Sequence, residues 1–179
     1  MRLQSLTHLI EVVRIVAQPK KVFVLGSASL LPAHPELGNP GGFLELTMDA
    51  DFLLEPVNEA IVESLQLAAG RDSAFMAQNG YYADILRPVI AETLPAGWET
   101  RLVPVPGYDN VFALDPYDLA MVKLVVGRQK DVDLLRALLK LGIIEPPRLS
   151  NHYQQTPLGE REAFTAGRNL QILLRELGL

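Results

Sequence analysis

The order in which helix-like and strand-like patterns follow one another limits the folds open to this chain more than any other feature. Apolar residues recur at helical spacing over 6–17 and predict an opening helix. Runs of β-forming residues over 21–25 and 43–54 predict two strands, separated by a segment rich in proline and glycine. A further helix is predicted over 56–69, where Gly70 ends the pattern.

The second half of the chain is predicted to be mainly helical. After short strand signals over 101–105 and 111–113, Asp115 and Pro116 are typical of the cap and first turn of a helix. That helix is interrupted at Gly127, and a second one runs to Gly142.

A final helix is predicted to begin at Thr156–Pro157 and to end near Leu177. Together these patterns predict the α+β class, with a small mixed sheet flanked by helices and a helical C-terminal half. We expect one domain over residues 1–179, with its core at about 20–145 and a helical extension at about 146–179.

Composition places the chain among ordinary globular proteins. Charged residues make up 21% and there is no cysteine, which excludes disulfides and thiolate metal sites. A net charge of −5 argues against a protein that coats nucleic acid, because such a protein needs a broad basic face. The N-terminus has no signal-peptide pattern, and no apolar run reaches the ~20 residues of a membrane span. We therefore expect a cytoplasmic protein that does not enter a membrane.

Asp49 and Asp51 are the first candidate site residues. In a strand, residues two apart point to the same face, so both carboxylates can share a divalent cation such as Mg²⁺. Taken alone, two nearby aspartates at the end of a strand are more often a solvated strand edge than a metal site. Gly26–Ser27 directly follows the first strand, where a glycine allows close backbone approach and a hydroxyl can hold phosphate oxygens. An ordinary turn with a serine cap is the alternative there.

A third cluster lies in the helical half. Lys123 sits among apolar helix residues, with Arg128 and Asp131 close behind it in the sequence. In a functional interpretation Lys123 and Arg128 anchor a triphosphate, and Asp131 assists the metal or the nucleophile. The alternative is a lysine whose stem lies along apolar surface while its ammonium group reaches water.

The order of these motifs resembles the nucleotidyltransferase superfamily, whose signature is a Gly–Ser turn followed by Asp-x-Asp on a strand. The run Leu114–Asp131 and the stretch Leu94–Val103 are similar to an uncharacterised bacterial nucleotidyltransferase-like family related to the AbiEii-type toxins of toxin–antitoxin systems. The resemblance covers about residues 20–145. It implies a nucleotidyltransferase-like fold.

The resemblance also implies roles. Asp49 and Asp51 would bind the metal–triphosphate, and the turn at Gly26–Ser27 would hold phosphate. Lys123 and Asp131 would complete the site. Two features depart from the superfamily pattern: the interval from the turn to Asp49 is longer than usual, and no third carboxylate stands on the later strand predicted around Val103 and Val105.

The function that we expect is transfer of a nucleotidyl group from an NTP with Mg²⁺ to an acceptor hydroxyl. RNA, a protein side chain and a small molecule all stay open as the acceptor, and an antitoxin protein is an expected partner if the chain belongs to a toxin–antitoxin pair. Two alternatives stay open as well. The first is a catalytically silent relative that binds a nucleotide or a partner, and the second is a structural interaction module.

Overall fold

The computed structural model describes residues 1–178, which form two compact units. The first comprises Met1–Glu92 and Arg101–Leu114, and the second comprises Thr93–Thr100 and the chain from Asp115 onward. The α+β class is confirmed, with a mixed sheet in the first unit and helices in the C-terminal half. The single domain expected from the sequence stays a prediction. Residue 179 lies outside the described residues.

The first unit contains the sheet, whose strand order is β3-β2-β1-β5-β4. Its strands are β1 (Lys21–Val24), β2 (Asp49–Glu55), β3 (Tyr82–Ile85), β4 (Val103–Pro104) and β5 (Val111–Ala113). Strand β1 pairs antiparallel with β2 and parallel with β5, whereas β2 pairs parallel with β3. Strand β2 is thus flanked on one side by β1 and on the other by the edge strand β3.

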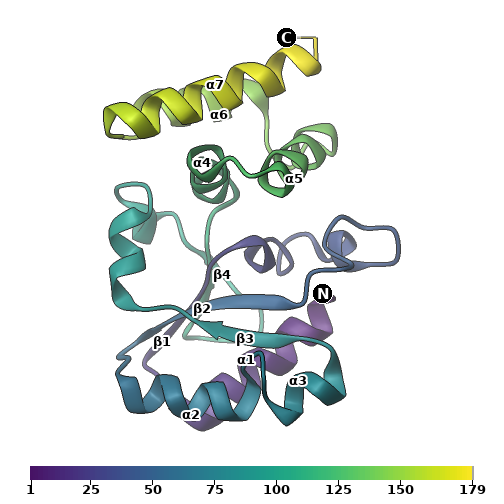
Figure 1. Ribbon diagram of the computed structural model, residues 1–179, viewed down its shortest axis with the longest axis vertical. Helices are drawn as coiled ribbons and strands as arrows, with labels where there is room; N and C mark the ends of the chain where they lie inside the picture. Colours follow the sequence, from purple (N-terminus) through teal and green to yellow (C-terminus); the bar gives the residue numbers. More distant parts are fainter. Residues whose placement is uncertain (179) are drawn as a thin grey trace. The chain divides into compact units, whose positions relative to one another are not determined.

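Three helices lie on one side of strands β1–β3, as Figure 1 shows. They are α1 (Leu3–Ala17), α2 (Glu59–Ala69) and α3 (Ala74–Asn79). The core of the unit is built from alternate strand residues and one apolar stripe of each long helix: Val22, Val24, Ala50, Phe52, Leu54, Leu6, Leu9, Ile10, Val13, Leu65 and Ala69. Because the pleat alternates, burying Ala50 and Phe52 turns Asp49 and Asp51 to the opposite face of the sheet.

Short 3₁₀ helices fill the irregular connections, and α2 and α3 begin with side-chain caps. The 3₁₀ segments are η1 (Ser27–Leu30), η2 (Pro35–Gly38), η3 (Pro88–Thr93) and η4 (Trp98–Thr100). The Ile61 amide donates to the Asn58 side chain at 2.9 Å, and the Met76 amide donates to the Ser73 hydroxyl at 3.2 Å. These caps satisfy amides that have no partner inside their own helices.

The second unit is helical, with α4 (Pro116–Val126), α5 (Gln129–Lys140), α6 (Pro146–Gln155) and α7 (Glu160–Glu176). Helix α4 contacts each of the other three. Asp115 caps α4 by accepting from the Tyr117 amide at 2.8 Å, and Gly127 ends it with φ +63°, so both boundaries are confirmed. Asn169 of α7 donates to the Leu124 carbonyl at 2.8 Å, which ties the end of α4 to α7.

Several predicted boundaries are wrong, each for a local reason. Residues 43–46 form turns, so β2 begins only at Asp49. Helix α2 begins at Glu59 because Asn58 rather than Pro56 supplies its cap. Strand β4 covers only two residues of the predicted 101–105. The final predicted helix is α7, which ends near Leu177 as expected but starts after Gly159 and not at Thr156–Pro157. Helix α6, which ends at Gln155 before that segment, was not predicted. Strand β3 was missed altogether.

Candidate active site

Asp49 and Asp51 lie at the start of β2. Both side chains are half-buried, whereas Ala50 between them and Phe52 after them are fully buried. Strand alternation therefore places both carboxylates on one face, as the two-residue spacing predicts. Leu53 and its antiparallel partner Phe23 follow on that same face, next to the aspartates. Apolar side chains from β2 and β1 thus continue the face beyond the carboxylates. The metal-binding role of Asp49 and Asp51 stays a prediction.

The turn at Gly26 lies directly against Asp51. The Leu25 amide donates to the Asp51 carbonyl at 2.8 Å, which carries the β1–β2 pairing up to the turn. Gly26 has φ +55° and ψ −164°, a conformation open essentially to glycine alone. A Cβ on Gly26 would stand 1.8 Å from Oδ2 of Asp51. Glycine is required here because its missing side chain leaves room for the Asp51 carboxylate.

Ser27 follows as the first residue of η1 and is half-buried. Over residues 1–178 its hydroxyl makes no hydrogen bond, whereas the neighbouring Ser29 hydroxyl donates to the Gly26 carbonyl at 2.8 Å. A half-buried hydroxyl of this kind has hydrogen-bonding capacity for a ligand. The serine-cap alternative does not hold, because Gly26 occupies the cap position of η1 and Ser27 caps nothing.

A third carboxylate, Asp84, stands on β3. The prediction that no third carboxylate follows on a later strand is therefore wrong. The parallel register pairs Asp51 with Asp84 and Asp49 with Tyr82, so these side chains lie on one sheet face. The strand predicted around Val103 is β4, which forms the edge of the sheet opposite β3 and does not neighbour β2. The run of β-forming residues after Gly80 was the available signal, but four residues are too few to separate a strand from a loop.

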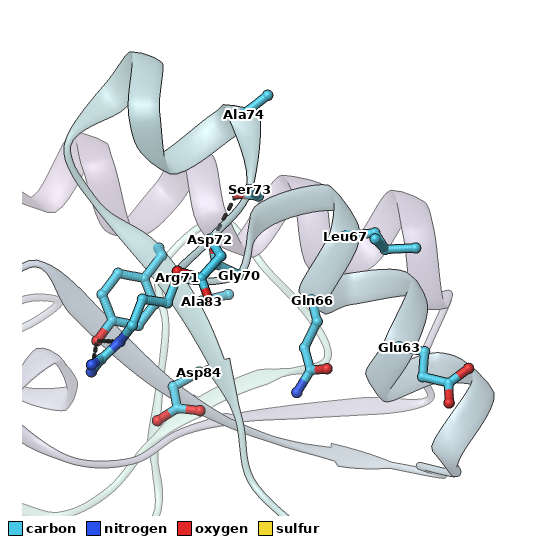
Figure 2. Close-up of a pocket in the computed structure, with 11 residues that line it drawn as sticks. Glu63, Gln66, Leu67, Gly70, Arg71, Asp72, Ser73, Ala74, Ala83 and Asp84 are labelled. Carbon is cyan, nitrogen blue, oxygen red and sulfur yellow. Dashed lines mark hydrogen bonds between the residues drawn. The ribbon is translucent and has the colours of Figure 1, made fainter.

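Arg71 is a second residue that sequence patterns did not reveal. It comes from the turn between α2 and α3, and its Nε and Nη2 donate to the Tyr82 hydroxyl at 3.1 and 2.6 Å (Figure 2). These hydrogen bonds are the main cause that raises the pKa of the Arg71 guanidinium, and attraction to Asp84 and Asp49 adds to it. A solvent-exposed cation is thereby held beside the carboxylates of the first unit. No spacing rule links Arg71 to Asp49, because the fold alone brings them together.

Lys123, Arg128 and Asp131 form an ion cluster within the second unit. Lys123 Nζ lies 3.1 Å from Asp131 Oδ1, and Arg128 Nε lies 2.7 Å from Oδ2 of the same carboxylate. Asp131 is 1% exposed, and burial by itself would raise its pKa. The hydrogen bonds and charges of Arg128 and Lys123 outweigh that effect, so the pKa of Asp131 is lowered.

The cluster decides one of the alternatives for Lys123. Its ammonium group is buried and paired, so the interpretation in which it reaches open water is wrong. The partner that a buried charge demands is Asp131. That Lys123, Arg128 and Asp131 complete the site of Asp49 and Asp51 stays a prediction, because these residues belong to different units.

The donor set of the first unit fits Mg²⁺ of the kind that nucleotides carry. Among residues 1–178, no three Asp, Glu, His or Cys side chains lie close enough to hold a metal ion by themselves. Mg²⁺ is commonly held by one or two carboxylates together with water and phosphate oxygens. Paired aspartates beside a phosphate-compatible turn therefore suit a metal that arrives with its nucleotide better than a resident one.

The comparison with protein families decides the family. The model of the family described as "Nucleotidyltransferase of unknown function (DUF6036)" matches residues 1–163. The chain belongs to this nucleotidyltransferase family. The match spans the whole first unit and most of the second. Comparisons with curated proteins and with solved structures gave no significant match.

The helices carry one further finding. None of those in residues 1–178 combines the length and the apolar character needed to cross a bilayer.

Proposed function

We propose that this nucleotidyltransferase transfers a nucleotidyl group from an NTP–Mg²⁺ complex to an acceptor hydroxyl on the carboxylate face of its sheet. One observation carries the proposal: the Asp51 carboxylate lies against Gly26, in space that only glycine leaves open. A metal-binding carboxylate beside a phosphate-compatible turn brings the metal and the triphosphate together. The solvated-edge alternative gives no reason for this fit.

The residues of the first unit have distinct roles in the proposed reaction. Asp49 and Asp51 hold the metal, which when bound offsets charge on the phosphate oxygens and on the attacking oxygen. The Gly26 backbone and the Ser27 hydroxyl bind the phosphates that leave as pyrophosphate. Asp84, across from Asp51 on β3, orients the acceptor hydroxyl and accepts its proton.

The experiment is a paired measurement of binding and transfer. Thermal shift with each of the four NTPs, with and without Mg²⁺, reports binding, because a ligand that binds only the folded state raises the melting temperature. Transfer is followed with α-³²P-labelled NTPs and cell extract. We expect an Mg²⁺-dependent shift and label in an acceptor, both lost in Asp51→Asn. Glu99→Gln, an exposed carboxylate outside this face, serves as the control that keeps both.

Two outcomes would redirect the proposal. A shift without transfer under any condition would favour the catalytically silent alternative, in which the same residues only bind a nucleotide. Neither shift nor transfer would leave the structural-module alternative standing. The AbiEii-type relationship, a toxin–antitoxin role and a cytoplasmic location stay part of the proposal. Growth arrest on expression, relieved by Asp51→Asn and by co-expression of an adjacent gene, would support the toxin role.

A further inference from the structure

A cavity of about 820 Å³ borders the carboxylate face at the edge of the sheet. It lies beside β3 and is walled by α2 and by the turn that leads to α3 (Figure 2). Asp84 is shared by the cavity and the proposed site. The other polar lining residues used below are Glu63, Gln66, Arg71, Asp72 and Ser73. A volume of this size is typical of sites for small molecules, which occupy ~300–1,000 Å³.

The position of the cavity relative to the turn has a chemical meaning. The Gly26 turn follows β1 and the cavity borders β3, whereas Asp51 stands on β2 between the two strands. In nucleotidyl transfer the attacking oxygen and the leaving pyrophosphate lie roughly in line on opposite sides of the phosphorus. If the turn holds the leaving phosphates, the acceptor must approach from the β3 side, where the cavity lies.

The charges of the cavity restrict the acceptor. Three exposed carboxylates line it (Glu63, Asp72 and Asp84), against the single cation Arg71. The Arg71 guanidinium is already hydrogen-bonded to Tyr82 and is attracted by Asp84 and Asp49. A polyanion such as RNA would be repelled, because nucleic-acid binding depends on basic residues that neutralise phosphates. A ligand that carries ammonium groups is attracted.

We propose that this cavity binds the acceptor, a low-molecular-weight compound that carries a hydroxyl and at least one ammonium group. The inference rests on the proposed function and names its substrate class. The acceptor oxygen forms a bond to the α-phosphorus of the NTP while the bond to pyrophosphate breaks. The hydroxyl proton passes to Asp84, and the products are the nucleotidyl ester of the acceptor and pyrophosphate. Glu63 and Asp72 position the ammonium group of the acceptor.

The test separates acceptors by charge. A low-molecular-weight cell extract is divided by cation- and anion-exchange resins, and the RNA and protein fractions are kept as further acceptors. Each is incubated with the protein, Mg²⁺ and α-³²P-labelled NTPs. We expect label in the cation-exchange fraction. The double variant Glu63→Gln/Asp72→Asn should raise the KM for that fraction about tenfold and leave the KM for NTP unchanged, since two exposed charge pairs are lost.

The control is Glu92→Gln, an exposed carboxylate of the first unit that does not line the cavity, and it should change neither constant. Label in RNA or protein would overturn the inference. A raised KM for NTP in the double variant would also overturn it, because that result would place the nucleotide in the cavity. Mg²⁺-dependent NTP binding with no label in any fraction would also overturn it while leaving nucleotide binding intact. Absence of both binding and transfer would instead reject the proposed function.

Discussion

Replacing Gly26 by alanine tests the link between the turn and Asp51 most directly. The added Cβ would stand 1.8 Å from Asp51 Oδ2, whereas ordinary contact begins at 3.4 Å. The carboxylate oxygen must therefore retreat by at least 3.4 − 1.8 = 1.6 Å. The atom that moves belongs to the end of a side chain, so the protein can fold around the change. The carboxylate can no longer occupy the position that its proposed metal role requires.

Two magnitudes follow from this geometry. An alanine at φ +55° and ψ −164° is strained by about 1–3 kcal/mol, which lowers the melting temperature by roughly 2–12 °C in a chain of this size. Displacing a site group by about 1 Å costs on the order of 100-fold in rate. We therefore expect Gly26→Ala to lose at least about 100-fold in nucleotidyl transfer while it stays folded at 25 °C.

Gly107→Ala is the matched control. Gly107 also has a positive φ, +88°, but a Cβ there meets nothing within 4 Å. This variant should lose about 1–2 kcal/mol of stability from backbone strain and keep its transfer rate. Thermal denaturation and the α-³²P transfer assay give both quantities. Equal transfer rates in the two variants would refute the reasoning, because the clash with Asp51 would then have no catalytic consequence.

Three further predictions concern charged groups. Without metal, Asp49→Asn should have a slightly higher melting temperature than the wild type, since like charges on one strand face repel each other. The variant should gain much less stability from Mg²⁺ plus NTP than the wild type does, and equal gains would remove the metal role from Asp49. Asp131→Asn should lower the free energy of unfolding by roughly 3–5 kcal/mol, because it leaves Lys123 buried without its partner. Asp133→Asn, whose partly exposed side chain pairs with Arg136 on α5, should cost under about 1 kcal/mol, and similar losses for the two variants in denaturant titrations would contradict the buried-pair account. The pKa of Asp131 is lowered on folding, so its contribution is full above the unfolded value of 3.8 and is lost as pH falls through the folded value. Below pH 3.8, the free energy of unfolding should therefore fall less steeply with decreasing pH in Asp131→Asn than in the wild type.

Sequence patterns predicted the common face of Asp49 and Asp51 and several helix boundaries, because the motifs behind them are local. The two-residue spacing of Asp49 and Asp51 fixes their common face by strand geometry, which needs no tertiary information. The caps at Asp115 and Gly127 were predictable for the same reason. The glycine directly after β1 could be read as a turn signal, but the reason that only glycine fits there is the tertiary contact with Asp51. The boundaries that failed, such as the start of α7, lie where several polar or proline residues compete as caps, and packing chooses among them.

The sequence by itself determined the alternation that turns Asp49 and Asp51 to one face, and the helical C-terminal half. Only the tertiary structure decided which strand lies beside β2. Strand pairing joins residues far apart in the chain, and the pairing of β2 with β3 places Asp84 opposite Asp51 across more than thirty intervening residues. The hydrogen bonds from Arg71 to Tyr82, and the cavity between α2, the turn after it and β3, likewise depend on where β3 lies. Packing also decided the partner of Lys123. Helix α5 buries the Asp131 carboxylate, and a buried charge needs the cations that Lys123 and Arg128 supply.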